Sequence, residues 1–183
     1  MELPTLESQR LLLRKASSAD IDDLYSLYSK PEVVRFTGDL VWTDTQQAVE
    51  FLEEADNEFK EQRLFGWCVA LKQTDKVIGT CALFDCELAM RFAEIAYAID
   101  PNYWRKGLTR ELVPLLIEFG FNILKLNRID AVVAPENSAS VKLLEGNHFQ
   151  HEGFKCESWI DPNGNPVDEY IMGLLHRDWM AKH

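Results

Sequence analysis

Two basic residues and a glycine stand between an apolar run and a long helical pattern, in the segment Arg105-Lys106-Gly107-Leu108-Thr109. The start of a helix has backbone N–H groups without intrahelical partners and carries the positive end of the helix dipole. Such a position binds phosphate groups, and a glycine there lets the ligand approach the backbone. The segment therefore predicts a phosphate or pyrophosphate site, although a basic solvent loop with a glycine turn explains the same residues equally well.

Two polar side chains stand where a protein could transfer protons. Ser140 falls in the first turn of a short helical segment that Asn137 would cap, and its hydroxyl can donate or accept a proton. Glu94 interrupts the apolar run at residues 92–97, where an acid either faces water or serves as a base with a shifted pKa. On residue type alone, a structural role for Ser140 and solvent exposure for Glu94 are the simpler interpretations.

Several common kinds of site are missing from the sequence. The four cysteines include no C-x-x-C pair and the four histidines no H-E-x-x-H motif, so we expect reduced thiols and no metal site. The Walker-type phosphate loop and the Rossmann glycine fingerprint are also absent. No apolar run reaches the ~18 residues that span a bilayer, and the first residues lack the apolar core of a secretory signal. We therefore expect a cytoplasmic protein with no membrane partner.

The charge balance bears on the partners. Nineteen basic residues against thirty acidic ones give a net charge of −11. A surface of this sign repels the phosphates of nucleic acids, so we expect no nucleic-acid partner. The same surface attracts cationic substrates such as amines, although plain solubility is the simpler explanation of the charge.

The elements that must position these residues form one α/β domain over residues 1–183. Apolar runs predict strands at residues 11–13, 65–71, 77–84, 92–99, 128–134, 149–160 and 167–175. One helix is predicted to begin near Asp20 and to end at Pro31. A second is predicted to follow a Thr43–Gln46 capping box, a third to extend over 108–123 with Pro114 inside, and a fourth over 138–144. This order predicts a mixed, mostly antiparallel sheet with helices on both faces and one parallel strand pair, beside whose carboxyl ends a ligand would bind.

Short motifs along the chain occur in an order that resembles the GNAT superfamily of acetyl-CoA-dependent N-acetyltransferases, and within it the RimJ/RimL-like branch. The resemblance extends from Arg10 to Trp179 and rests on Arg10-Leu11-Leu12-Leu13-Arg14, Pro31-Glu32-Val33, Phe65-Gly66-Trp67, Ile78-Gly79-Thr80, Ala93-Glu94-Ile95-Ala96-Tyr97, Tyr103-Trp104-Arg105-Lys106-Gly107, Glu136-Asn137-Ser138-Ala139-Ser140, Glu152-Gly153-Phe154 and Asp168-Glu169-Tyr170. It implies a six- to seven-stranded sheet with a V-shaped cofactor gap between the fourth and fifth strands, at residues 92–99 and 128–134.

The resemblance implies acetyl-CoA as the cofactor and a set of residues that bind it. The pantetheine arm would bond to the backbone of the strand at 92–99, and the pyrophosphate to backbone N–H groups of the loop that follows. The expected cofactor-binding residues are Tyr97, Ala98, Ile99, Trp104, Arg105, Lys106, Gly107, Leu108, Thr109, Asn137 and Ser140.

The resemblance also implies direct transfer of the acetyl group to a primary amine, with no metal. Ser140 is then the candidate acid at the departing thiolate, Glu94 the candidate base, and Asp168 a second acidic candidate near the acceptor. The RimJ/RimL-like branch implies a protein N-terminus as the acceptor, and it also contains enzymes for small amines, amino acids and antibiotics. A homodimer is compatible with the sequence.

Some residues depart from the family pattern and motivate an alternative, a non-catalytic acyl-CoA-binding module. They are Arg105, Ala96 and His148 in place of glycines, Thr109 in the cofactor loop, Pro114 in the helix after it, and Leu144 where many members carry an acid tyrosine. A pure binding module has no need of Ser140, Glu94 and Asp168, so the enzyme is the favoured prediction.

Overall fold

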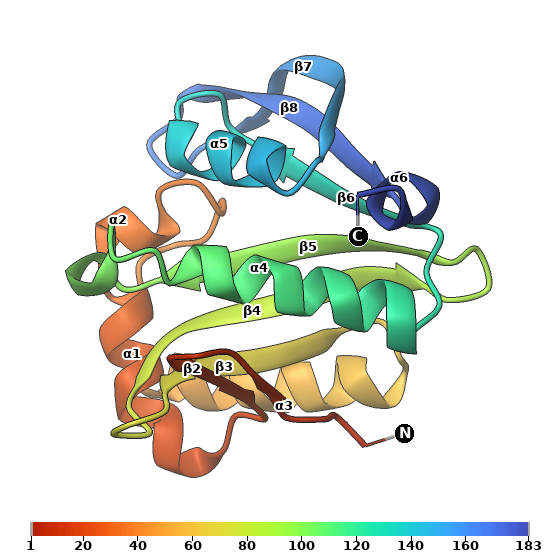
Figure 1. Ribbon diagram of the computed structural model, residues 1–183. Helices are drawn as coiled ribbons and strands as arrows, with labels where there is room; N and C mark the ends of the chain where they lie inside the picture. The colour runs from red at the N-terminus through yellow and green to blue at the C-terminus, as the bar shows by residue number, and fades with distance from the viewer. Residues whose placement is uncertain (1, 183) are drawn as a thin grey trace.

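The computed structural model describes residues 2–182, which are arranged around one eight-stranded mixed sheet (Figure 1). The strands lie in the order β1-β2-β3-β4-β5-β6-β8-β7. Their bounds are β1 Leu6–Glu7, β2 Leu11–Arg14, β3 Phe65–Leu71, β4 Val77–Glu87, β5 Phe92–Ile99, β6 Arg128–Val133, β7 Gln150–Ile160 and β8 Pro166–Leu175. All seven predicted strands are present, and β1, which is too short to show a pattern, is the one that the prediction missed.

The helices differ from the predicted ones mainly at their ends. Their bounds are α1 Ile21–Tyr28, α2 Pro31–Val34, α3 Gln46–Lys60, α4 Thr109–Glu118, α5 Ser138–Gly146 and α6 His176–Met180, with 3-10 turns at Ser18–Asp20 and Pro101–Tyr103 and a π turn at Phe119–Ile123. α1 ends at Tyr28, before Pro31, as predicted. Pro31 then begins α2, because the first turn of a helix does not use the N–H group that proline lacks.

The predicted capping box at Thr43 and Gln46 is wrong by one residue. The helix begins at Gln46, so Gln47 is the residue whose side chain reaches back: its Oε1 accepts the Thr43 N–H at 2.8 Å. Asp44 Oδ1 accepts the Gln46 N–H at 2.8 Å, at the first residue of the helix.

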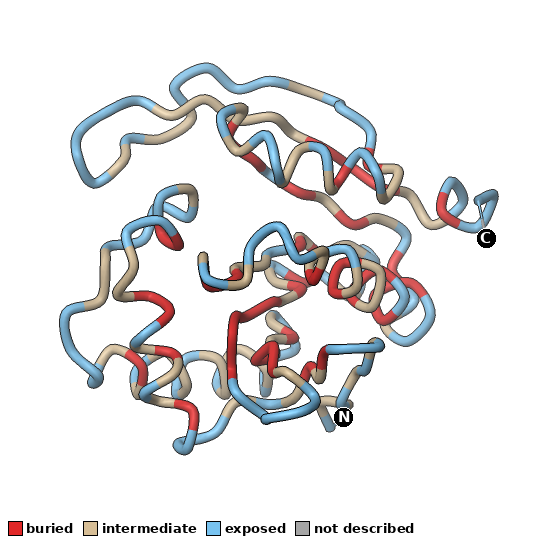
Figure 2. Tube along the Cα trace, turned by 60° about the vertical axis from the view of Figure 1, so that its left-hand side comes forward, coloured by how far each residue is buried: buried red, intermediate tan, exposed pale blue. Residues whose placement is uncertain are grey.

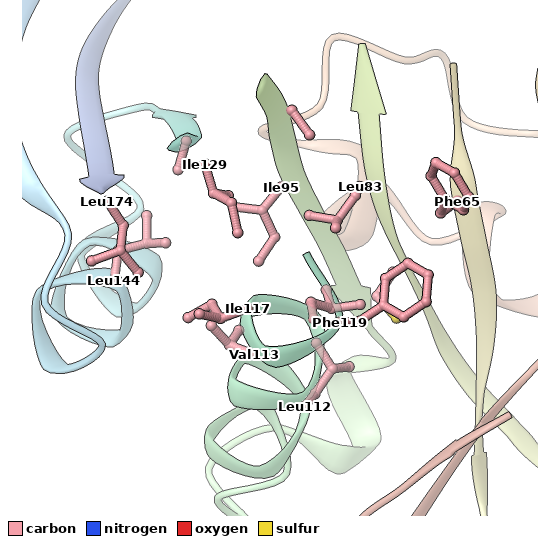
Figure 3. Packing of buried hydrophobic residues seen from close by; sticks show 14 of the residues in the cluster. Phe65, Leu83, Ile95, Leu112, Val113, Ile117, Phe119, Ile129, Leu144 and Leu174 are labelled. Atoms are coloured by element: carbon pink, nitrogen blue, oxygen red, sulfur yellow. The ribbon is translucent and has the colours of Figure 1, made fainter. Parts of the chain in front are cut away.

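Helices cover both faces of the sheet and bury two apolar clusters. On one face, Leu112, Val113 and Ile117 of α4 belong to the same apolar cluster as Leu83 and Ile95 of the sheet (Figure 3). On the other face, α1, α2 and α3 bury a second cluster against β3 and β4, with Leu24 at its centre. Figure 2 shows the buried segments concentrated in the middle of the molecule, whereas the hairpin of β7 and β8 is largely exposed along β7.

Pro114 does not end the helix in which it lies. α4 continues through it to Glu118 and leads directly into the π turn. A proline inside a helix costs about 3 kcal/mol through the lost backbone bond and the ring's clash. Leu112, Val113 and Leu116 around it are 0% exposed, and their burial, worth about 2 kcal/mol each, offsets that loss.

β5 and β6 separate part-way along their length. They form a parallel pair from Phe92↔Arg128 to Glu94↔Asp130. Beyond these residues β5 continues beside β4 and β6 beside β8, and the two strands diverge (Figure 1). This is the V-shaped arrangement predicted for the strands at 92–99 and 128–134.

Candidate active site

Successive side chains of β5 point to opposite faces of the sheet. Ala93, Ile95 and Ile99 belong to the apolar cluster under α4, and Tyr97 packs against that cluster. Glu94 therefore lies on the opposite face, the face on which Ala98 packs with the α1–α3 cluster. Glu94 and Tyr97, both singled out in the sequence, therefore lie on opposite faces of the strand.

Glu94 is half-buried, so the simpler interpretation of an exposed acid is wrong. The strand pairing places it opposite Asp130, whose carboxylate pairs with Arg128 Nε at 2.6 Å. Burial raises the pKa of Glu94 above its usual range, and neighbouring negative charges raise it further. The charged groups that act on it are Asp85, Asp130 and Glu169, which raise the pKa, and Lys155, which lowers it. A carboxylate in these surroundings is a stronger base than an exposed one.

Ser140 lies in the first turn of α5, and Asn137 caps that helix as predicted. Asn137 Oδ1 accepts the Ser140 N–H at 3.2 Å. The Ser140 hydroxyl also forms a 2.7 Å hydrogen bond with the hydroxyl of Tyr97. Because Tyr97 belongs to β5 and Ser140 to the helix after β6, this bond joins the two sides of the diverging strands.

The predicted anion site has the backbone that a phosphate group needs. Arg105 and Gly107 have φ of 59° and 74°, so the chain turns sharply before α4. Within residues 2–182, the backbone N–H groups from Arg105 through Arg110 donate to no protein acceptor. They stand at the N-terminus of the ten-residue α4. The same loop carries Lys106, whose ammonium lies over the Tyr103 ring, 4.8 Å from its centre. This is a cluster of free donors with a positive field, which suits a pyrophosphate.

The other expected cofactor residues form a continuous path from β5 to α4. Ala98 and Ile99 end β5, where the β5–β6 pairing has already stopped. Trp104 follows the 3-10 turn, and its Nε1 donates to the Ile99 carbonyl at 2.6 Å, so that carbonyl already has a partner. Leu108 is buried just before α4, which begins at Thr109.

Arg10, near the start of the chain, contacts the loop Arg105–Thr109 of the predicted anion site, here called the anion loop. Its Nη1 donates to the Lys106 carbonyl at 2.9 Å, and its Nε pairs with Glu111 Oε1 at 2.6 Å. Its Nη2 lies 3.6 Å from where a Cβ on Gly107 would stand. Arg10 was missed as a site residue, although the motif at residues 10–14 was the signal that could have pointed to it.

The sequence also singled out Asp168, Leu144 and His148, and the structure shows the surroundings of each. Asp168 Oδ1 accepts the Glu157 N–H at 2.8 Å, beside an irregularity in the pairing of β7 with β8. Leu144 is 1% exposed in the core and supplies no acid where many family members carry tyrosine. His148 has φ of 69°, the left-handed conformation that favours the glycine usual at its position.

The described residues 2–182 hold no group of three or more His, Cys, Asp or Glu side chains placed to bind a metal ion. None of the helices in this part of the chain has the length and apolar character needed to cross a membrane.

Comparison with known proteins decides the family, because residues 10–150 match the acetyltransferase (GNAT) domain. The chain belongs to the GNAT acetyltransferase family. Uncharacterized N-acetyltransferase p20 of Bacillus licheniformis is 37% identical over 97% of this chain and 99% of its own. Spermidine N(1)-acetyltransferase of Vibrio cholerae is 25% identical over 96% and 98%, respectively. The crystal structure of spermidine N-acetyltransferase from Vibrio cholerae in complex with CoA and spermine covers 94% of this chain and 99% of that one, with a TM-score of 0.84 at 24% identity.

Membership of the GNAT family confirms the predicted enzyme class and cofactor. The chain is an N-acetyltransferase that uses acetyl-CoA, which supplies the acetyl group as an activated thioester. The free N–H groups from Arg105 through Arg110 and the adjacent bases fit the pyrophosphate of this GNAT cofactor. The non-catalytic alternative loses its support, because relatives that span the whole chain carry the name of an enzyme.

We expect Arg10→Ala to raise the KM for acetyl-CoA about tenfold, because it removes a positive charge beside the anion loop and releases the Lys106 carbonyl. Steady-state rates at varied acetyl-CoA concentration measure this. Arg14→Ala is the matched control: Arg14 stands at the other end of β2 and pairs with Asp20 and Asp75, at 2.8 Å each. It should lower the melting temperature and leave this KM unchanged. The same KM in wild type and Arg10→Ala would show that Arg10 supports only the fold.

Proposed function

We propose that the chain acetylates a primary amine of a small molecule that carries a second positive charge, such as a di- or polyamine, by direct transfer from acetyl-CoA. The observation that supports this most is the set of acids around Glu94. Of the four charged groups that act on Glu94, three are carboxylates, Asp85, Asp130 and Glu169, and one is a cation, Lys155. An excess of negative charge attracts cations and raises their local concentration.

In this proposal, the chain's own residues divide the work along β5. Glu94 takes the proton of the incoming ammonium, directly or through water. Backbone N–H groups of β5 beyond Glu94, where no β6 residue pairs with the strand, stabilise the negative charge that develops on the carbonyl oxygen. The loop at Arg105–Thr109 binds the pyrophosphate. Much of the rate then comes from holding the amine and the thioester together.

Two kinds of acceptor compete within the proposal. A full-length relative is named for spermidine, a small cationic amine, which supports a di- or polyamine as the acceptor. The RimJ/RimL-like branch, which the sequence motifs resemble, makes a protein N-terminus the second candidate. The acids around Glu94 and the net charge of −11 favour the molecule with more positive charge. We further propose that residues 1–183 act as a single acetyltransferase domain.

Release of the CoA thiol, measured across a panel of acceptors, tests the proposal. We expect kcat/KM for a diamine to exceed that for a monoamine of equal chain length by about tenfold at low ionic strength, and the ratio to shrink as salt is added. A preference for peptides with free N-termini would instead support the RimJ/RimL-like function. Acetyl-CoA binding without acetylation of any acceptor and without thioester hydrolysis would contradict the proposed enzyme activity.

A further inference from the structure

Two hydroxyl groups join β5 to α5 across the region where β5 and β6 separate. The hydroxyls of Tyr97 and Ser140 form a 2.7 Å hydrogen bond. Ser140 is held a second time, because its N–H donates to Asn137 Oδ1 at 3.2 Å. The ring of Tyr97 packs against the apolar cluster under α4. The Ser140 hydroxyl is therefore fixed by groups whose own positions are set by packing and helix capping.

The hydroxyl pair has a hydrogen to spare. Two hydroxyls carry two hydrogens, and their mutual bond uses one of them, whichever group is the donor. Burial raises the pKa of Tyr97 to about 12, so both groups keep their hydrogens at neutral pH. The second hydrogen can be donated to a third group beside β5.

The pair and Glu94 lie on opposite faces of β5. Tyr97 packs toward α4, whereas Glu94 lies on the face of Ala98. In direct acyl transfer the amine approaches the carbonyl carbon from one side while the sulfur leaves from another. A base for the amine and a hydrogen-bond donor for the sulfur are thus needed in different places. The position of the Tyr97–Ser140 pair fits the sulfur.

We propose that Tyr97 is a positioning residue that acts through Ser140 on the departing thiolate of CoA, an inference that rests on the proposed function. The new C–N bond forms as the C–S bond breaks, and the electron pair of the C–S bond goes to sulfur. Ser140 donates a hydrogen bond to that sulfur, and Tyr97 donates to Ser140 Oγ and so holds the Ser140 hydrogen in the required direction. The amine proton passes to Glu94 and then to water, and the thiolate takes its proton from water. The pair thus takes the place of the acid tyrosine that many family members carry at the position of Leu144.

The first test uses CoA alone and needs no acceptor. Ultraviolet absorbance of the thiolate, measured against the complex with desulfo-CoA, gives the pKa of the bound CoA thiol. We expect the wild-type protein to lower this pKa by about one unit relative to free CoA, and both Tyr97→Phe and Ser140→Ala to reverse the shift. An equal thiol pKa in wild type and Tyr97→Phe overturns the inference. Failure of the wild-type protein to bind CoA at all would instead refute the proposed function beneath it.

Tyr28→Phe is the matched control for that titration. The Tyr28 phenol also has its pKa raised by burial to about 12, and it bonds Thr80 Oγ1 at 2.6 Å. Tyr28 belongs to the cluster on the other face of the sheet. Its loss should lower stability and leave the CoA thiol pKa unchanged; a thiol shift in this variant would show that any buried tyrosine produces the effect and would overturn the inference.

Kinetics supply the second test. We expect Tyr97→Phe to lower kcat by about tenfold with an unchanged KM for acetyl-CoA, since a hydrogen bond to a charged group is lost only as the thiolate forms. Because Tyr97 acts through Ser140, the double variant Tyr97→Phe/Ser140→Ala should be no slower than Ser140→Ala. Effects that multiply in the double variant, or that appear in KM alone, would show a bond that merely ties β5 to α5.

Discussion

Replacing Gly107 with glutamate is expected to abolish the binding of acetyl-CoA in a calorimetric titration. Gly107 stands among the free N–H groups of Arg105 through Arg110, where we place the pyrophosphate. Two like charges about 4 Å apart near a protein surface repel by about 4 kcal/mol, which corresponds to roughly thousandfold weaker binding. The new carboxylate would also stand beside Arg10 Nη2, which is 3.6 Å from the added Cβ, and would withdraw that cation from the cofactor.

Gly107→Gln separates the charge from backbone strain. Gly107 has φ of +74°, where any side chain costs about 1–2 kcal/mol. Glutamine has the shape of glutamate without its charge, so we expect it to weaken acetyl-CoA binding by only about tenfold. Equal losses in the two variants would assign the effect to strain. Wild-type affinity in Gly107→Glu would place the pyrophosphate elsewhere in the protein.

The turn at Arg105–Gly107 and the start of α4 could be predicted from the sequence because the residues that form them are local. A glycine, two bases and the start of a helix all lie within a few residues. The same holds for the cap of α5, where Asn137 and Ser140 are three residues apart. The strands Phe65–Leu71 and Phe92–Ile99 have the bounds predicted for them, because a run of apolar residues between polar flanks marks both ends of a buried strand.

Contacts between distant segments could not be predicted in this way. The Arg10–Lys106 contact joins residues 96 positions apart, and the Tyr97–Ser140 bond joins residues 43 apart. Each contact depends on which strands become neighbours in the sheet. Glu94 was interpreted as exposed for the same reason: its burial and the nearness of Asp130 arise only when β5 pairs with β6.

The departures from the family pattern matter less in the structure than they do in the sequence. Arg105 adopts φ of 59° without being glycine, and the N–H groups that follow it remain free for a ligand. α4 continues through Pro114 because its neighbours are fully buried. Leu144 removes one acid from α5, while the Tyr97–Ser140 pair places two hydroxyls at the start of the same helix. These changes alter how the site is built and leave its parts in place.

The second large effect is expected from Glu94→Gln, which should lower kcat by about a hundredfold and leave the affinity for acetyl-CoA unchanged. Glutamine keeps the shape of the side chain and removes its ability to take up a proton, and general bases contribute about this much to catalysis. Steady-state kinetics and a calorimetric titration with acetyl-CoA measure the two quantities. A hundredfold loss of affinity in this variant would mean that Glu94 supports the cofactor site.

The pH dependence shows whether Glu94 is the base. Burial, and then the charges of Asp85 and Asp130, raise the pKa of Glu94, so it stays protonated, and inactive as a base, up to a higher pH than an ordinary glutamate. The wild-type rate should therefore fall as pH decreases through this raised pKa, and Glu94→Gln should lack that fall. At high pH the amine acceptor is already neutral and needs no base, so the deficit of the variant should narrow.

Asp85→Asn tests the cause of the raised pKa. Asp85 is exposed and has φ of 46°, a conformation that asparagine tolerates, so the fold should be kept. Loss of its negative charge lowers the pKa of Glu94, and the acid limb of the rate profile should move to lower pH, while the KM for a diamine rises because one attracting charge is gone. An acid limb that does not move, together with a Glu94→Gln deficit that is the same at every pH, would mean that Glu94 holds the cationic acceptor and that another group, or water, takes its proton.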